Sequence, residues 1–286
     1  MQYGARGSET CTAPNERFAG AAARTVANDM GTRLDVFAVG TLWGDSMTTF
    51  VLVHGAWHGG WCWNRVRHNL NETGGDVDVY TPTLTGLGER AHLVSRDTSL
   101  EMHIADVLGV LEMEDLTDIV LVGHSYGGVV VTAVADRAAG RVARLIYLDA
   151  VVPRDGQCLY DCVSPQAKAF FEQQAGDSWC IPVATASAQY LGLKLEQDVR
   201  WVVPKLKPHP IRTFRDAVRL TSKAPSSPRA YINCIGDKPT GQQRSVQADG
   251  IDDYHELQAG HDAMIAAPQE VAELLRNISN CAADRA

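Results

Sequence analysis

The stretch that says most about the fold of this chain is DIVLVGHSYGGVVVTAVA, residues 118–135. The apolar run 118–122 predicts a strand, and residues 129–138 predict a helix, so GHSYG lies at a sharp strand-to-helix turn. Gly-x-Ser-x-Gly in this context is typical of a nucleophile elbow, whose strained backbone would clash with a side chain at either glycine. We therefore predict that Ser125 is a nucleophile. The alternative is a tight turn whose serine only caps the helix.

A second motif lies upstream of the elbow. The apolar run FVLV at 50–53 predicts a strand, and HGAWHGGW follows it at 54–61. An oxyanion hole beside a nucleophile elbow takes one backbone N–H from such a loop and one from the residue after the nucleophile. The predicted donors are Ala56 and Tyr126. Residues next to these donors and to the nucleophile are expected to line the substrate pocket: Gly55, Trp57 and His124.

A third motif lies near the C-terminus. Residues 253–257 predict a late strand, AGHDAM follows at 259–264, and residues 268–278 predict a helix. The general base that serves a nucleophile elbow comes after the serine and the acid in chain order. We therefore predict that His261 is the general base. The alternative is a solvated loop histidine.

These motifs together resemble the α/β-hydrolases, and most of all the branch that holds plant methylesterases, hydroxynitrile lyases and small bacterial esterases. The resemblance is carried by residues 51–63, 122–128 and 260–264, and it extends from about residue 48 to the C-terminus. It implies a mostly parallel sheet flanked by helices, with a helical cap insertion. It also implies a serine hydrolase that forms an acyl-enzyme and needs neither a metal nor an organic cofactor.

Two positions separate the hydrolases from the lyases of this branch. The lyases resemble one another in having threonine at the position of Gly55 and lysine at the position of Asp262. That lysine stabilises departing cyanide by its positive charge, and a carboxylate would do the opposite. The sequence therefore favours an esterase.

The acid that orients the histidine has two candidates. Asp149 ends the predicted strand 145–149, and Asp237 follows the predicted strand 230–234 in a Gly-Asp-Lys-Pro turn. A carboxylate beside apolar residues 150–152 is expected to be buried and to need a partner, whereas Asp237 can be satisfied by water. This difference favours Asp149. The alternatives are a structural Asp149 and a solvated Asp237.

Composition narrows the class of protein. The chain has 286 residues, 45% of them hydrophobic, and a net charge of −8. The negative charge argues against nucleic acid and anionic membranes as partners, and no apolar stretch is long enough to span a bilayer. The seven cysteines lack a Cys-x-x-Cys pair, which favours a reduced, cytoplasmic protein, and no metal-ligand spacing occurs.

The expected organisation has three parts. Residues 1–46 form an extension that we expect to be poorly ordered, with Met47 as the natural start; the alternative is an edge strand at 34–39. Residues 47–152 and 223–286 form the α/β core. Residues 153–222 form a helical cap with helices expected over three stretches: 166–174, 196–203 and 211–220.

The function expected is hydrolysis of small apolar or aromatic carboxylic esters by a monomer or homodimer. The cap is expected to cover the mouth of the site, and its aromatic residues are expected to line an apolar pocket, which suits an apolar substrate. The alternative for these aromatic residues is that they only form the core of the cap. The alternatives are a lactone, carbamate or C–C bond hydrolase with the same triad, and a small-molecule binding protein without catalysis. The cap aromatics are Phe170, Phe171, Trp179, Tyr190 and Trp201.

Overall fold

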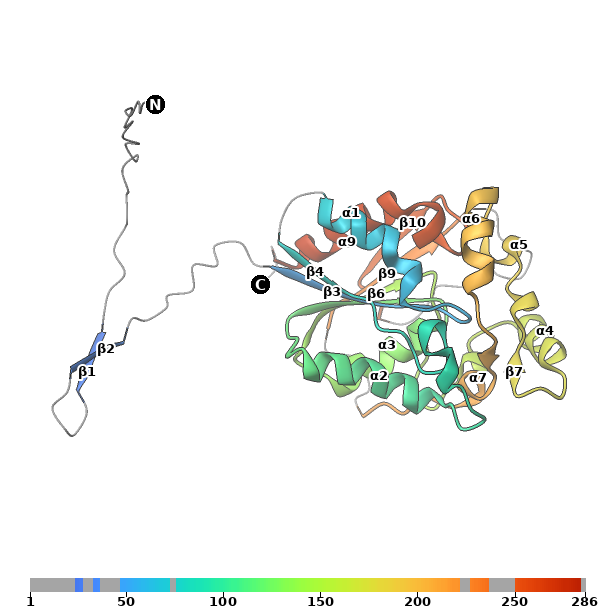
Figure 1. The fold of residues 1–286 in the computed structure, drawn as a ribbon, viewed down its shortest axis with the longest axis horizontal. Helices are drawn as coiled ribbons and strands as arrows, with labels where there is room; N and C mark the ends of the chain where they lie inside the picture. The colour runs from blue at the N-terminus through green and yellow to red at the C-terminus, as the bar shows by residue number, and fades with distance from the viewer. Residues whose placement is uncertain are drawn as a thin grey trace, which may run out of the picture. The chain divides into compact units, whose positions relative to one another are not determined.

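The computed structural model describes residues 24–27, 33–36, 47–72, 76–221, 227–236 and 250–283 (Figure 1). The chain divides into two units, Met1–Ser46 and Met47–Ala286. In the first unit, β1 (Arg24–Ala27) pairs with β2 (Arg33–Val36) in an antiparallel two-stranded sheet. Residues 34–36 of the alternative strand expected at 34–39 thus form a strand, and its partner is β1. Whether the rest of 1–46 is poorly ordered concerns residues outside the described ones.

The second unit is built on a six-stranded sheet in the order β10-β9-β6-β5-β3-β4. Every neighbouring pair of strands runs parallel. The middle strands are apolar along nearly their whole length because helices cover both faces of the sheet. The predicted α/β fold is confirmed. The strands are β3 (Thr48–Val53), β4 (Val77–Tyr80), β5 (Ile119–His124), β6 (Val142–Leu148), β9 (Arg229–Cys234) and β10 (Asp253–Leu257).

Helices form the two outer layers (Figure 1). On one face α1 (Asn64–Glu72) packs against α9 (Pro268–Ala283), and on the other α2 (Leu100–Met113) packs against α3 (Gly127–Arg137). The helices predicted at 129–138 and 268–278 are confirmed by α3 and α9. Shorter helical elements of the core are η1 (Gly60–Trp63), η2 (Gly88–Leu93) and α8 (Ala263–Ala266).

A long insertion joins β6 to β9 and gathers at one end of the sheet (Figure 1). The insertion contacts the core loop after β3, because Lys207 N–H donates to the Trp57 carbonyl at 2.9 Å. Its elements are η3 (Leu159–Asp161), α4 (Pro165–Ala175), β7 (Cys180–Ile181), η4 (Val183–Thr185), α5 (Ala188–Leu191), α6 (Glu196–Val202), η5 (Val203–Lys205), β8 (His209–Pro210) and α7 (Arg212–Arg215).

Two of the three helices expected in the insertion are confirmed, by α4 and α6, and the third is wrong. The chain leaves the helical conformation after Arg215 instead of continuing to residue 220. The reason is competition for backbone donors. Val218 N–H donates to the Gln157 carbonyl at 2.9 Å, and Leu220 N–H donates to the Asp155 carboxylate at 2.9 Å. These donors are unavailable for helical hydrogen bonds.

Membrane-spanning helices, metal sites and cysteines were each addressed by the sequence predictions. No helix within the described ranges is long and apolar enough to cross a membrane. The same residues contain no group of three or more His, Cys, Asp or Glu side chains that could hold a metal ion. Among the described cysteines, Cys62, Cys158 and Cys180 are free thiols.

Candidate active site

Ser125 occupies the turn between β5 and α3 in a strained conformation. Its φ is 52°, a left-handed value that non-glycine residues rarely adopt. Hydrogen bonds to the neighbouring strand hold the turn: Ser125 N–H donates to the Leu148 carbonyl at 3.3 Å, and its carbonyl accepts from Val151 N–H at 3.0 Å. The turn presents the Ser125 hydroxyl at the carboxyl end of the sheet. Its side chain is nearly buried, and the residue is 7% exposed.

The glycines of the elbow are required by close backbone contacts. A Cβ at Gly123 would lie 2.8 Å from the carbonyl oxygen of Gly127, and a Cβ at Gly127 would lie 2.7 Å from that of Val53. The predicted clash at both positions is confirmed. Gly128 has the same requirement, because its Cβ would lie 2.2 Å from the Val151 carbonyl oxygen.

His261 lies between Ser125 and Asp149. Its Nε2 is 2.9 Å from Ser125 Oγ, and its Nδ1 is 2.6 Å from Asp149 Oδ2. A carboxylate only accepts, so Nδ1 carries the proton and the Nε2 lone pair faces the serine hydroxyl. This is the tautomer that a general base needs. The structure thus brings together the three residues predicted as nucleophile, base and acid.

Asp149 is held in place at the end of β6. Its φ is 45°, and its N–H donates to the Ile232 carbonyl of β9 at 2.8 Å. The residue is 2% exposed, so its carboxylate has to be compensated by partners such as His261. The competing acid, Asp237, lies outside the described residues.

The predicted oxyanion donors lie at matching positions on adjacent strands. Val53 of β3 pairs with Gly123 of β5, and Ala56 and Tyr126 each follow three residues later. Both residues are buried. Within the described residues, neither Ala56 N–H nor Tyr126 N–H has an acceptor. The loops touch at Gly55, where a Cβ would lie 2.9 Å from Ser125 Cβ.

A histidine that the sequence analysis did not single out fixes Tyr126. His103 Nε2–H donates to the Thr85 carbonyl at 2.9 Å, so its Nδ1 accepts from the Tyr126 hydroxyl at 2.8 Å. Burial lowers the pKa of His103 to about 4, which keeps it neutral at physiological pH. The residue that carries one candidate oxyanion donor is therefore anchored through its side chain.

Trp57 lies in an aromatic cluster formed mainly by the insertion. Its ring centroid is 6.2 Å from Phe171, 5.9 Å from Tyr190 and 6.4 Å from Phe214. Tyr190 also approaches the base, with 5.8 Å between its ring centroid and that of His261. The role of Trp57 and Gly55 in lining a substrate pocket stays a prediction.

His124, the third predicted pocket residue, contacts the backbone of the candidate base His261. It is buried, and its Nε2–H donates to the His261 carbonyl at 2.9 Å. Burial, followed by the neighbouring His261, lowers the pKa of His124 to about 3, so its ring is neutral. His124, which directly precedes Ser125, therefore holds the backbone of His261 by this hydrogen bond.

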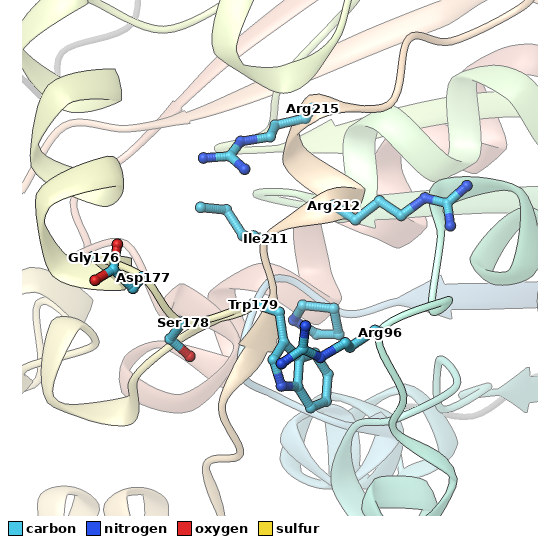
Figure 2. Close-up of a pocket in the computed structure, with 9 residues that line it drawn as sticks. Arg96, Gly176, Asp177, Ser178, Trp179, Ile211, Arg212 and Arg215 are labelled. Carbon is cyan, nitrogen blue, oxygen red and sulfur yellow. The ribbon is translucent and has the colours of Figure 1, made fainter.

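A hollow of about 360 Å³ lies between the insertion and the core loop that carries Arg96, and Figure 2 shows the side chains around it. None of Ser125, His261 and Asp149 lines it. The Arg212 guanidinium extends away from Asp177 and Ser178 (Figure 2). The lining residues are Arg96, Gly176, Asp177, Ser178, Trp179, Pro210, Ile211, Arg212 and Arg215.

The insertion docks directly on the loop that carries His261. Asp262 N–H donates to the Leu191 carbonyl at 2.8 Å. Gly192, with φ of 72°, packs so closely that a Cβ there would lie 2.6 Å from Gly260 Cα. We expect Gly192→Ala to lower stability through left-handed strain of about 1–2 kcal/mol and through overpacking of roughly 1–3 kcal/mol more. It should also lower kcat, because the displaced loop carries the candidate base His261.

The matched control for this prediction is Gly140→Ala. Gly140 has φ of 91°, and no described atom beyond its chain neighbours lies within 4 Å of the added Cβ, so it tests backbone strain alone. Urea unfolding and ester hydrolysis would be measured for both variants. Equal losses of stability with unchanged kcat in both would show that the Gly192 contact does not matter.

Comparison with known proteins places this site in a family. A model of the alpha/beta hydrolase family matches residues 50–274. The chain belongs to the alpha/beta hydrolase family. The resemblance expected from the three motifs is confirmed.

Individual relatives of this hydrolase are esterases by name. It is 38% identical over 241 residues to the carbendazim hydrolyzing esterase of Nocardioides sp. (strain SG-4G), covering 80% of this chain and 98% of the relative. It is 23% identical over 250 residues to the putative methylesterase 14, chloroplastic, of Arabidopsis thaliana, covering 80% and 71% of the two chains.

Among solved structures, this hydrolase resembles an extracellular alpha/beta-hydrolase from a Paenibacillus species. The TM-score is 0.71 at 24% sequence identity, with 80% of this chain and 98% of the other covered. At that identity the likeness concerns the fold.

Proposed function

We propose that this protein is a serine hydrolase that cleaves small apolar or aromatic carboxylic esters through an acyl-enzyme intermediate. The observation that carries the proposal is the chain of hydrogen bonds from Ser125 through His261 to Asp149. The esterase relatives support ester hydrolysis, and a serine nucleophile suits the family. A serine at position 125 also fits acyl transfer better than chemistries that need a carboxylate nucleophile.

The proposed reaction follows from the roles of these groups. Ser125 Oγ attacks the ester carbonyl while His261 Nε2 takes its proton, and Asp149 stabilises the imidazolium that forms. The N–H groups of Ala56 and Tyr126 donate to the oxygen as it becomes negative. His261 then protonates the leaving alcohol, and in the second half of the reaction it activates the water that releases the acid.

The proposed substrate class rests on the surroundings of the serine. Trp57, Phe171 and Tyr190 form an apolar cluster beside His261, which favours an apolar or aromatic acyl or alkyl group. We further propose that residues 153–222 act as a cap over the site. The contacts of Tyr190 and Leu191 with the His261 loop support that proposal.

A cytoplasmic location is also proposed. The thiols of Cys62, Cys158 and Cys180 support it, because structural disulfides are typical of oxidising compartments.

The function is tested by turnover of a panel of substrates. p-Nitrophenyl acetate and p-nitrophenyl hexanoate represent short and medium esters, and carbendazim and a γ-lactone represent the carbamate and lactone alternatives. We expect hydrolysis of at least one ester. A folded protein that is inert toward both esters but cleaves another substrate would favour the alternative hydrolases. Tight binding without turnover of any substrate would favour a binding protein.

A further inference from the structure

Two buried, oppositely charged residues join the loops that carry the candidate oxyanion donor and the candidate base. His58 lies two residues after Ala56, and Asp262 directly follows His261. His58 Nε2 is 3.0 Å from Asp262 Oδ2, although 204 residues separate them in the chain. Their side chains are 2% and 0% exposed. The contact therefore links the loop that carries Ala56 to the loop that carries His261.

The partners of His58 determine its protonation. Its Nδ1 lies 2.7 Å from the Ala56 carbonyl oxygen, and its Nε2 faces the Asp262 carboxylate. Both of these groups only accept hydrogen bonds, so both ring nitrogens must donate. A ring that donates from both nitrogens is an imidazolium. The geometry thus indicates a buried cation paired with a buried carboxylate.

The electrostatic surroundings agree with this assignment. Burial alone would lower the pKa of His58, but the charge and hydrogen bond of Asp262 and the Ala56 carbonyl raise it above 6.5. Burial alone would raise the pKa of Asp262, but His58, followed by His124 and His261, lowers it. The other titratable groups that interact with the pair are His54, Cys62, His124, His209 and His261.

Asp262 depends on His58 for this compensation. Its second carboxylate oxygen, Oδ1, has no hydrogen-bond partner within the described residues. A buried carboxylate that loses a cationic partner is strongly destabilised, so the two residues should act as one unit. Such a pair adds little to the free energy of unfolding, because the cost of burying both charges offsets their attraction. Its effect is to hold the two residues in one geometry.

We propose that His58 and Asp262 are positioning residues, a buried imidazolium–carboxylate pair that holds the Ala56 loop against the His261 loop. Through the Ala56 carbonyl and the residue next to His261, the pair fixes the distance between the oxyanion donors and the base. The inference rests on the proposed function of that site. Neither residue touches the reacting atoms.

The first test is spectroscopic and needs no substrate. The nitrogen resonances of His58 would be recorded by NMR in the wild type and in Asp262→Asn across a pH titration. The wild type should show both ring nitrogens protonated at and above pH 6.5, and Asp262→Asn should lose one proton at lower pH. A neutral His58 in the wild type at pH 6.5 would overturn the proposal. Since this result does not depend on ester hydrolysis, it separates this inference from the proposed function.

The second test is kinetic. We expect Asp262→Asn and His58→Gln each to lower kcat by up to about 10²-fold with little change in KM, because small misplacements of catalytic groups have effects of this size. The double variant should lose no more than the worse single variant, as coupled residues do. If the double variant lost the sum of the two single losses, the pair would not act as one unit. If His58→Gln left kcat unchanged although His58 is an imidazolium in the wild type, the pair would not position the site.

The pH profile separates positioning from packing. A cation with a raised pKa contributes fully below pH 6.5, and its contribution is lost as pH rises through the raised value. The alkaline decline of kcat should therefore move to lower pH in Asp262→Asn. The matched control is Asp136→Asn, which removes a buried carboxylate bonded to Thr221 N–H at 2.6 Å. It should cost stability without moving the profile. The same shift in both variants would overturn the proposal.

Discussion

Replacement of Ser125 by alanine is expected to lower kcat for ester hydrolysis by about 10⁶-fold, the size of effect seen when a triad serine is removed. The nucleophile is lost, while His261 and the backbone donors of Ala56 and Tyr126 remain. Residual turnover above the rate in water would then report the oxyanion donors and substrate binding alone. Steady-state hydrolysis of p-nitrophenyl acetate measures the effect, and circular dichroism confirms that the variant is folded.

The control for this prediction is Ser164→Ala. Ser164 Oγ accepts from Ala167 N–H at 3.1 Å and caps α4, away from the triad. Its replacement should cost about 1 kcal/mol of stability and leave kcat unchanged. A Ser125→Ala variant that keeps more than a tenth of wild-type kcat would exclude Ser125 as the nucleophile.

The second large effect is expected for Asp149→Asn, which should lower kcat by roughly 10⁴-fold. An asparagine that faces His261 Nδ1 with its N–H₂ group would favour the other tautomer of the ring. The proton would then lie on Nε2, which faces Ser125 Oγ at 2.9 Å and could no longer accept the serine proton. The KM for p-nitrophenyl acetate should change much less than kcat.

Asp237→Asn is the direct comparison, because Asp237 is the competing acid. We expect its kcat to stay within a few-fold of the wild type if Asp149 orients the base. A larger loss in Asp237→Asn than in Asp149→Asn would reverse the assignment. Small and equal losses in both variants would mean that neither residue is the acid.

The sequence predicts the fold well because the decisive signals are local. The apolar run 50–53 predicted β3, residues 253–257 before the histidine motif predicted β10, and the elbow motif predicted the glycine clashes at Gly123 and Gly127. The helix expected at 211–220 was wrong because its backbone donors bond to distant residues, which helix propensity does not report.

The site was less predictable where it depends on contacts between distant residues. His58 lies within the glycine-rich loop and Asp262 within the histidine motif, but no spacing indicates that residues 204 apart form a pair. The same limit applies to His103, which fixes Tyr126 from α2. In the sequence, Asp262 stood out only because it replaces a lysine of the lyases. The structure adds that Asp262 is paired with the buried His58, which the motif alone does not indicate.

In the proposed reaction, Ser125 carries the acyl group during ester hydrolysis. The most direct measurement mixes the protein with p-nitrophenyl acetate, stops the reaction with acid during turnover, and analyses the peptides by mass spectrometry. We expect one acetyl group on the peptide that contains Ser125, and none on that peptide in Ser125→Ala. Turnover with no acetyl group on Ser125, or with the acetyl group on another residue, would contradict the account.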